Sequence, residues 1–277
     1  MTIVHRPIQT PVSAEAGTDE ADRARLIDIA NRAATLVQVD ERRIASLAFA
    51  PGDGITTSQG RSGTYGGTLT DNAGKSYGMS CAHVAEQGDT ISDSSGGHLG
   101  TCKDHTSLVK LGAGLVCDPA VLQMPHPYPG NGPDVNMLDV SLIDLAAVPA
   151  SARTLSGVAQ SLTIGQDVDV DGSITKTSCR LGSLAISYAF ATAGKTFCFR
   201  DSIELKPRAK YGIGGALGTL LSTTLPTQGD SGAWVLTQDA TPAWAGIFFA
   251  EDGQRGYCIR AKWAHAWAEG IVGKLFV

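Results

Sequence analysis

The sequence predicts an all-β protein whose antiparallel strands form barrels or a sandwich. From Gly63 onward, short runs rich in β-branched and aromatic residues alternate with turns marked by Gly, Asn and Asp. The chain has 33 glycines among 277 residues and only 18% charged residues, a composition that suits many tight turns. At this length it can bury a full core, either as one large domain or as two lobes.

Residues 1–50 are expected to form a separate N-terminal helical extension. A polar, proline-containing tail precedes a helix start at 18–20, where a capping hydroxyl is followed by two acids. Leu26, Ala30, Ala33 and Val37 then repeat at helical spacing. We expect an amphipathic helix on the surface of the main domain, with a partner-binding helix or a removable pro-segment as the alternatives.

Residues 51–277 are expected to form the main domain, with strands in two sets at about 60–148 and about 155–260. The expected strands are 65–70, 76–81, 107–111 and 138–145, and then 173–179, 196–205, 233–237, 243–249 and 256–260. Residues 118–136 are rich in Pro, Gly, Asn and Asp and predict a surface loop. Residues 262–272 predict a C-terminal helix that carries Trp263, Trp267 and Ile271 on one face.

The Gly-Asp-Ser-Gly motif at 229–232 is the most informative stretch of the chain. Glycines around a serine suit a tight turn whose backbone N–H groups converge on one reacting oxygen. The same residues also occur in ordinary loops, so the motif alone is only suggestive. Two upstream features add weight, because His83 ends a half-apolar run and Asp139 opens a strand-like run at 139–145.

Histidine, aspartate and serine in this chain order resemble the trypsin/chymotrypsin-like serine peptidases. The resemblance covers about residues 60–267, and the segment 171–182 looks like the start of the second barrel in bacterial members. It implies two antiparallel six-stranded β-barrels with a C-terminal helix. It also implies a serine endopeptidase that works through an acyl-enzyme intermediate.

The residue types fit that chemistry. Ser231 is a poor nucleophile until a base removes its proton, and His83 is the candidate base because imidazole titrates near neutral pH. Asp139 would hold the imidazole tautomer and stabilise the imidazolium. Backbone N–H groups of Gly229 and Ser231 would form the oxyanion hole, and Asp230 would anchor the loop.

Each of these assignments has a structural alternative. His83 could be a partly buried strand histidine, and Ser231 an ordinary turn serine. Asp144 is a competing acid on the same run as Asp139. Asp139 is preferred because it stands at the entrance of the predicted strand.

A zinc site is the alternative for a second group of residues. The group consists of Cys81, His83, His98, Cys102 and His105. Zinc ligands normally show compact paired spacings, and this set matches none of the common ones. No metal and no other cofactor is therefore expected.

The resemblance also implies a substrate pocket. Leu225 aligns with the position that holds an acid in arginine- or lysine-specific members, so specificity for basic side chains is not expected. Phe249, Ala250 and Glu251 would form the pocket wall, and Gly256 would lie near its back. This wall departs from the usual Ser-Trp-Gly sequence.

Composition and charge limit the partners. The net charge is −5 and no basic stripe stands out, which argues against nucleic acid. No apolar run approaches the roughly 18 residues that a membrane span needs. The first residues lack the apolar core and cleavage site of a secretory signal. We therefore expect a cytoplasmic protein that acts on protein or peptide substrates, with non-classical export left open.

The six cysteines leave the redox state open. Extracellular members of the family carry disulfides, one of which usually involves a cysteine just after the catalytic histidine, whereas Cys81 precedes it here. Without an export signal, we expect all six thiols to be reduced. Pairing of Cys102 with Cys117, or of Cys179 with Cys198, is an alternative that spacing cannot decide.

Three functional hypotheses follow. The leading one is an active serine endopeptidase. The alternatives are a catalytically weak trypsin-fold protein that acts as a binding module, and a β-rich structural or lectin-like protein. In many members of the family that this chain resembles, a cut frees an apolar N-terminus that pairs with the acid before the serine. Cleavage at Arg43–Ile44 would offer such a terminus to Asp230, but residues 45–47 do not resemble the glycine-bearing segment that normally follows such a cut. The uncleaved chain is therefore expected to be active.

Overall fold

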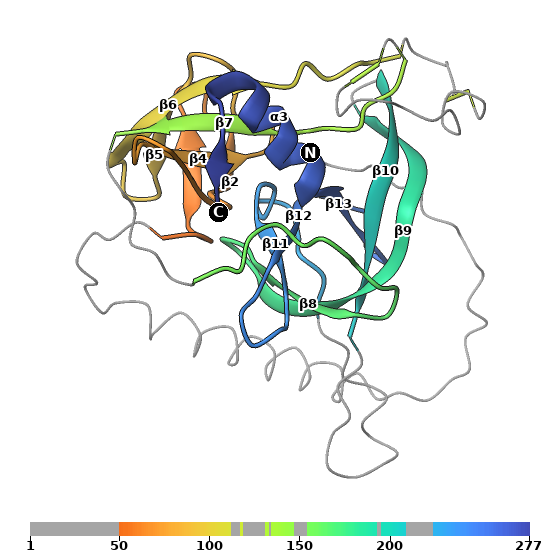
Figure 1. Ribbon diagram of the computed structural model, residues 1–277. Coiled ribbons are helices and arrows are strands. Elements are labelled where there is room, and N and C mark those ends of the chain that lie inside the picture. Colours follow the sequence, from red (N-terminus) through yellow and green to blue (C-terminus); the bar gives the residue numbers. More distant parts are fainter. Residues whose placement is uncertain are drawn as a thin grey trace, which may run out of the picture. The chain divides into compact units, whose positions relative to one another are not determined.

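A computed structural model describes residues 50–111, 117–118, 131–132, 134–146, 154–192, 195–208 and 224–277. Strands are the main regular element of the described residues, which contain one α-helix, near the C-terminus (Figure 1). The all-β prediction is confirmed. The helix expected within residues 1–50 and the cleavage site at 43–44 lie outside the described residues.

The first sheet contains eight antiparallel strands in the order β14-β3-β4-β7-β6-β5-β1-β2. Its strands are β1 (Gly54–Thr57), β2 (Ser62–Thr64), β3 (Gly67–Asp71), β4 (Ser76–Ser80), β5 (Thr90–Asp93), β6 (His98–His105), β7 (Ser141–Leu145) and β14 (Leu275–Phe276). β2 and β3 are consecutive pieces of one segment, of which β2 pairs with β1 and β3 pairs with β4. The segment thus pairs with β1 at one end of the sheet and with β4 near the other, where β14 pairs with β3 as the last strand.

The second sheet is a closed barrel in the order β10-β13-β12-β11-β8-β9, as predicted (Figure 1). Its strands are β8 (Asp167–Asp171), β9 (Lys176–Thr192), β10 (Lys195–Pro207), β11 (Trp234–Thr237), β12 (Trp244–Glu251) and β13 (Gly256–Arg260). The register of the long β9–β10 hairpin shifts near Asp201, which has a positive φ of 53°. The Asp201 carboxylate accepts hydrogen bonds from Arg260 Nε at 2.8 Å and Trp263 Nε1 at 2.5 Å, which ties β10 to the start of the helix.

Two hydrophobic clusters form the core. The first gathers the side chains of the first sheet with Trp234 and Trp244, and the second fills the closed barrel. The alternating pattern of β8 points Val168 and Val170 into the second cluster. The rings of Trp234 and Trp244 stack with their centroids 4.2 Å apart. A Cβ at Gly67 would lie 2.6 Å from the Trp234 ring, so this close approach requires glycine.

The helix α3 spans Ala261–Val272, and the predicted C-terminal helix is confirmed. Ala264 and Ala268 are buried, and Trp263, Trp267 and Ile271 pack against the first cluster. No helix in the described part of the chain is long and apolar enough to cross a membrane.

The strand predicted at 107–111 is wrong. Only Leu111 forms an isolated bridge there, with Thr196. The buried side chain of Asn136 accepts a hydrogen bond from Val109 N at 2.7 Å and donates one to Val109 O at 2.9 Å. A side chain thus satisfies the backbone groups that a strand partner would have used.

The expectation that all six thiols are reduced is also wrong. Cys117 and Cys198 form a disulfide between the segment that follows β6 and strand β10. The sequence suggested a different partner for each of these two cysteines. They are 81 residues apart in sequence, and only folding brings their Cα atoms to 5.7 Å. The other four cysteines are free and buried: Cys81, Cys102, Cys179 and Cys258.

Candidate active site

His83 and Asp139 form a buried pair. Asp139 Oδ2 lies 2.6 Å from His83 Nδ1, and Asp139 Oδ1 accepts a hydrogen bond from the His83 backbone N–H at 3.0 Å. The Asp139 side chain is fully buried, while that of His83 is 14% exposed. A buried carboxylate needs such partners, since burial of an unpaired charge is costly. The pair therefore joins two segments that are far apart in sequence.

Neighbouring strands position both members of the pair. His83 follows β4 in a tight turn in which Val84 N and Ala85 N both donate to Cys81 O at 3.1 Å. Asp139 precedes β7, and Ser141 Oγ donates to Cys81 O at 3.2 Å. Because β4 and β7 are paired strands, the two side chains meet at one end of the sheet.

Asp144, the competing acid, lies elsewhere. Its carboxylate forms an ion pair with Lys75 Nζ at 2.7 Å. The Lys75 side chain is 46% exposed and the Asp144 side chain 35% exposed. Of the two acids considered, the structure thus places Asp139, and not Asp144, against His83.

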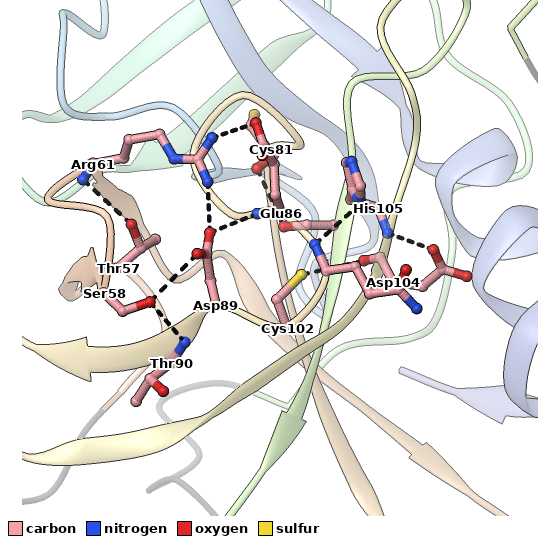
Figure 2. A network of polar contacts seen from close by, with 12 residues as sticks. Thr57, Ser58, Arg61, Cys81, Glu86, Asp89, Thr90, Cys102, Asp104 and His105 are labelled. Carbon is pink, nitrogen blue, oxygen red and sulfur yellow. Dashed lines mark hydrogen bonds and ion pairs between the residues drawn. The ribbon is translucent and has the colours of Figure 1, made fainter.

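A polar network holds the turn that follows His83 (Figure 2). The buried Asp89 carboxylate accepts hydrogen bonds from Arg61 Nη2 at 2.6 Å and from Glu86 N at 2.9 Å. Arg61 also pairs with the Glu86 carboxylate. Burial lowers the pKa of Arg61, but the hydrogen bonds to Glu86 and Asp89 outweigh it, so that this pKa lies above its usual value.

The structure does not assemble the zinc set considered from the sequence. His98 is exposed on β6, and His105 Nδ1 accepts a hydrogen bond from Gln87 N at 3.1 Å. In the described part of the chain, the donor atoms that gather are those of Cys81, His83 and Asp139, within 4.8 Å of one another. Burial, and then the charge of Asp139, raise the pKa of the Cys81 thiol well above its usual value, which opposes the thiolate that zinc prefers.

The loop at 227–232, which carries the candidate nucleophile Ser231, lies against the first sheet, where Thr64 N donates to Ser231 O at 2.8 Å. Gly229 has a φ of +101°, and Asp230 N donates to Thr227 O at 3.0 Å to close the turn. Ser231 is nearly buried, and its Oγ donates to Phe249 O at 3.4 Å. His83 Nε2 is buried and has no hydrogen-bond partner among the described residues. The structure therefore brings His83 and Asp139 together, while the Ser231 hydroxyl does not bond to the imidazole.

The predicted oxyanion donors are the backbone N–H groups of Gly229 and Ser231. Within the described residues, neither Gly229 N nor Ser231 N donates to a protein acceptor. A backbone N–H that lacks an internal acceptor is available to a ligand oxygen.

The Asp230 carboxylate is fully buried and held by backbone donors. Its Oδ1 accepts from Ile174 N at 2.7 Å and from Thr175 N at 3.1 Å. Its Oδ2 accepts from Thr227 N at 2.9 Å. A carboxylate with three such donors is stabilised without a cationic partner.

The same architecture occurs in solved bacterial proteases. Nocardiopsis protease (NAPase) aligns with a TM-score of 0.51 and 13% identity, over 79% of this chain and 96% of that chain. Thermobifida fusca protease A aligns with a TM-score of 0.53 and 12% identity, over 83% of this chain and 98% of that chain. The chain has the trypsin-like serine protease fold. No family model matches the sequence, and no curated protein matches it either.

In this trypsin-like fold, three predicted pocket residues share the β12–β13 hairpin. Glu251 and Gly256 are paired across the two strands, and Phe249 lies on β12. The Phe249 ring is almost fully buried, with its centroid 4.8 Å from that of Phe199, so it presents its carbonyl rather than its ring to Ser231. Leu225 packs against the core of the second barrel. The pocket assignment stays a prediction.

Sequence reasoning missed the residues that hold the loop at 227–232. Thr64 Oγ1 and Ser173 Oγ both donate to Gly229 O, at 2.9 and 3.0 Å. Single Thr and Ser residues near turns are common, so no spacing or motif marked these two. The only hint was the position of Ser173 in a segment that resembles the start of the second barrel.

Proposed function

We propose that this protein is a serine endopeptidase that cleaves protein or peptide substrates with Ser231, His83 and Asp139. The observation that carries the proposal is the hydrogen bonding of the two nitrogens of the His83 ring. Its Nδ1 is bonded to a buried carboxylate at 2.6 Å, and its Nε2 is buried without a partner. Because an ionised carboxylate can only accept, the neutral ring carries its proton on Nδ1, and the Nε2 lone pair is then free to act as a base.

The first half of the proposed reaction forms an acyl-enzyme. The Ser231 hydroxyl leaves Phe249 O, turns about its side-chain bond and donates to His83 Nε2; such contacts often tighten only when substrate is bound. As Oγ attacks the scissile carbonyl carbon, its proton passes to Nε2, and the N–H groups of Gly229 and Ser231 stabilise the oxyanion. Collapse breaks the C–N bond, and the imidazolium returns the proton to the leaving amine.

The second half releases the acid product. Water takes the place of the amine, His83 accepts a proton from it, and the resulting hydroxide attacks the acyl carbon. The bond to Ser231 Oγ then breaks, and Oγ recovers its proton from His83. Asp139 stays ionised throughout and offsets the charge of the imidazolium.

A binding module with this fold is the second candidate. The observation in its favour is the bond from the Ser231 hydroxyl to Phe249 O, which leaves the nucleophile and the base unconnected. In that case the protein would bind a peptide without cleaving it. A folded protein that is inert to active-site probes would support this candidate.

Labelling with a fluorophosphonate tests the proposed function. We expect the wild-type chain to label and to hydrolyse peptides, whereas Ser231→Ala does neither although its fold is intact. His83→Ala should slow both by several orders of magnitude. Ser95→Ala, which changes an exposed turn serine, serves as the matched control. Wild-type activity in Ser231→Ala would contradict the proposal.

A further inference from the structure

Thr64, the last residue of β2, bonds to both sides of the nucleophile. Its backbone N–H donates to Ser231 O at 2.8 Å, and its hydroxyl donates to Gly229 O at 2.9 Å. Thr64 is fully buried. The two acceptors flank the Asp230–Ser231 segment, so one residue of the first sheet holds the loop that carries the candidate nucleophile and both oxyanion donors.

The same residue also bonds to the segment that carries the candidate base. Ser80 Oγ, at the end of β4 just before His83, donates to Thr64 O at 2.8 Å. Gly232 fits closely between the two, since a Cβ there would lie 2.3 Å from Thr64 O and 2.4 Å from Ser80 Oγ. Thr64 is thus a shared neighbour of the histidine segment and the serine loop.

Ser173 completes the arrangement around the Thr64 hydroxyl. Ser173 N donates to Thr64 Oγ1 at 3.1 Å, while Ser173 Oγ donates to Gly229 O at 3.0 Å. The Thr64 hydroxyl therefore acts as donor and acceptor at once, and the Gly229 carbonyl receives two hydroxyl donors. The N–H of the same peptide unit, that of Asp230, bonds to Thr227 O.

These bonds matter because glycine supplies no steric restraint of its own. Gly229 has a φ of +101° and can rotate more freely than any residue with a Cβ. Its carbonyl must therefore be fixed by hydrogen bonds if the peptide planes of the loop are to keep one orientation. The two oxyanion donors, Gly229 N and Ser231 N, lie in the peptide units on either side of it, so a rotation of this unit would shift one donor relative to the other.

We propose that Thr64 is a positioning residue for the peptidase reaction. It sets the separation between His83 Nε2 and Ser231 Oγ and the direction of the Gly229 and Ser231 N–H groups. This inference rests on the proposed function. It predicts that the Thr64 hydroxyl acts on kcat, because the oxyanion forms only in the transition state.

The test compares three variants with wild type. Thr64→Val keeps the shape and the backbone N–H but removes the hydroxyl. Thr64→Ser restores the hydroxyl. Thr237→Val is the matched control, because Thr237 is also buried and its Oγ1 accepts a backbone hydrogen bond, from Ala243 N at 2.9 Å, at the β11–β12 hairpin. For each variant, kcat and KM for a peptide substrate, the Ki of a peptide aldehyde and Tm are measured.

We expect Thr64→Val to lower kcat by about tenfold or more, the scale of a small misplacement in an active site, with little change in KM. The peptide aldehyde forms a tetrahedral adduct, so its Ki should rise by a similar factor. Thr64→Ser should recover most of the rate. Thr237→Val should keep the wild-type kcat even where its Tm falls as far as that of Thr64→Val.

The outcomes separate this inference from the proposed function. If wild type labels with fluorophosphonate but Thr64→Val keeps the wild-type kcat and aldehyde affinity, the role of Thr64 is overturned and the peptidase proposal stands. A rise in KM alone, or a loss that follows Tm equally in both valine variants, also overturns it. A wild-type chain inert to probe and substrate overturns both proposals.

Discussion

The two oxygens of the Asp139 carboxylate accept two different hydrogen bonds from one residue, His83. One comes from the backbone N–H at 3.0 Å and the other joins the ring Nδ1 at 2.6 Å. Two contacts to one fully buried carboxylate restrain both the position of the histidine backbone and the rotation of its ring. The orientation of the candidate base is therefore set before any substrate arrives.

Asp139→Asn should lower kcat by about 10⁴-fold, because an amide in that place favours the wrong imidazole tautomer. Steady-state kinetics at neutral pH measure the loss. Asp144→Asn is the matched control, since Asp144 pairs with Lys75 at the surface and such pairs contribute about 0–1 kcal/mol to stability. A large loss in Asp144→Asn with little loss in Asp139→Asn would reverse the assignment.

The chain should be active without cleavage. Three backbone donors already hold the Asp230 carboxylate, so no freed N-terminus is needed to order the loop. Uncleaved protein, its length checked by mass spectrometry, should label with fluorophosphonate, and Arg43→Gln should label at the same rate. Activity that appears only after proteolysis, and not in Arg43→Gln, would show that residues before Ile44 are an inhibitory pro-region.

Loss of the Cys117–Cys198 disulfide should lower the free energy of unfolding by about 2–5 kcal/mol, the usual range for a native disulfide. Urea unfolding of Cys117→Ser measures it, and the Cys117→Ser/Cys198→Ser double variant should behave alike. Wild type in reductant should match both variants. Six reactive thiols in denatured, unreduced protein, instead of the four free cysteines of the structure, would show that the disulfide is absent.

Stability should fall at alkaline pH. Burial, and then the charge of Asp169, raise the pKa of the Cys179 thiol from 9.0 to about 12. The folded state therefore keeps a proton that the unfolded chain releases, so the stabilisation is complete below pH 9 and is lost as pH rises toward 12. The slope from one such thiol approaches about 1.4 kcal/mol per pH unit.

Urea unfolding between pH 8 and pH 10.5 measures this dependence. Cys179→Ala removes the titrating group, so its free energy of unfolding should decline less steeply with pH than that of wild type. Equal slopes in the two proteins would show that the Cys179 thiol is not responsible.

Much of the architecture could be read from local patterns. The 262–272 helix, the β10, β12 and β13 strands and the all-β class follow from periodicity and turn residues, which act over a few neighbours in sequence. The strands β1, β2, β5, β6 and β8 were missed. The first three have only three or four residues each, and β6 and β8 contain Gly or Asp, which are rare in strands and typical of turns. The candidate triad was predicted from short motifs, because a nucleophile, a base and an acid each require a particular residue type.

By itself, the sequence determined which residue types were present and in what order: a histidine, an acid and a serine between glycines, on a chain that favours strands. Only the tertiary structure decided which of them meet. It paired His83 with Asp139 and left Asp144 at the surface, joined Cys117 to Cys198, and placed Thr64 against Gly229 and Ser231. The physical reason is that these contacts are short-ranged in space but join residues far apart in sequence, and their partners are set by strand register and barrel packing rather than by any local preference.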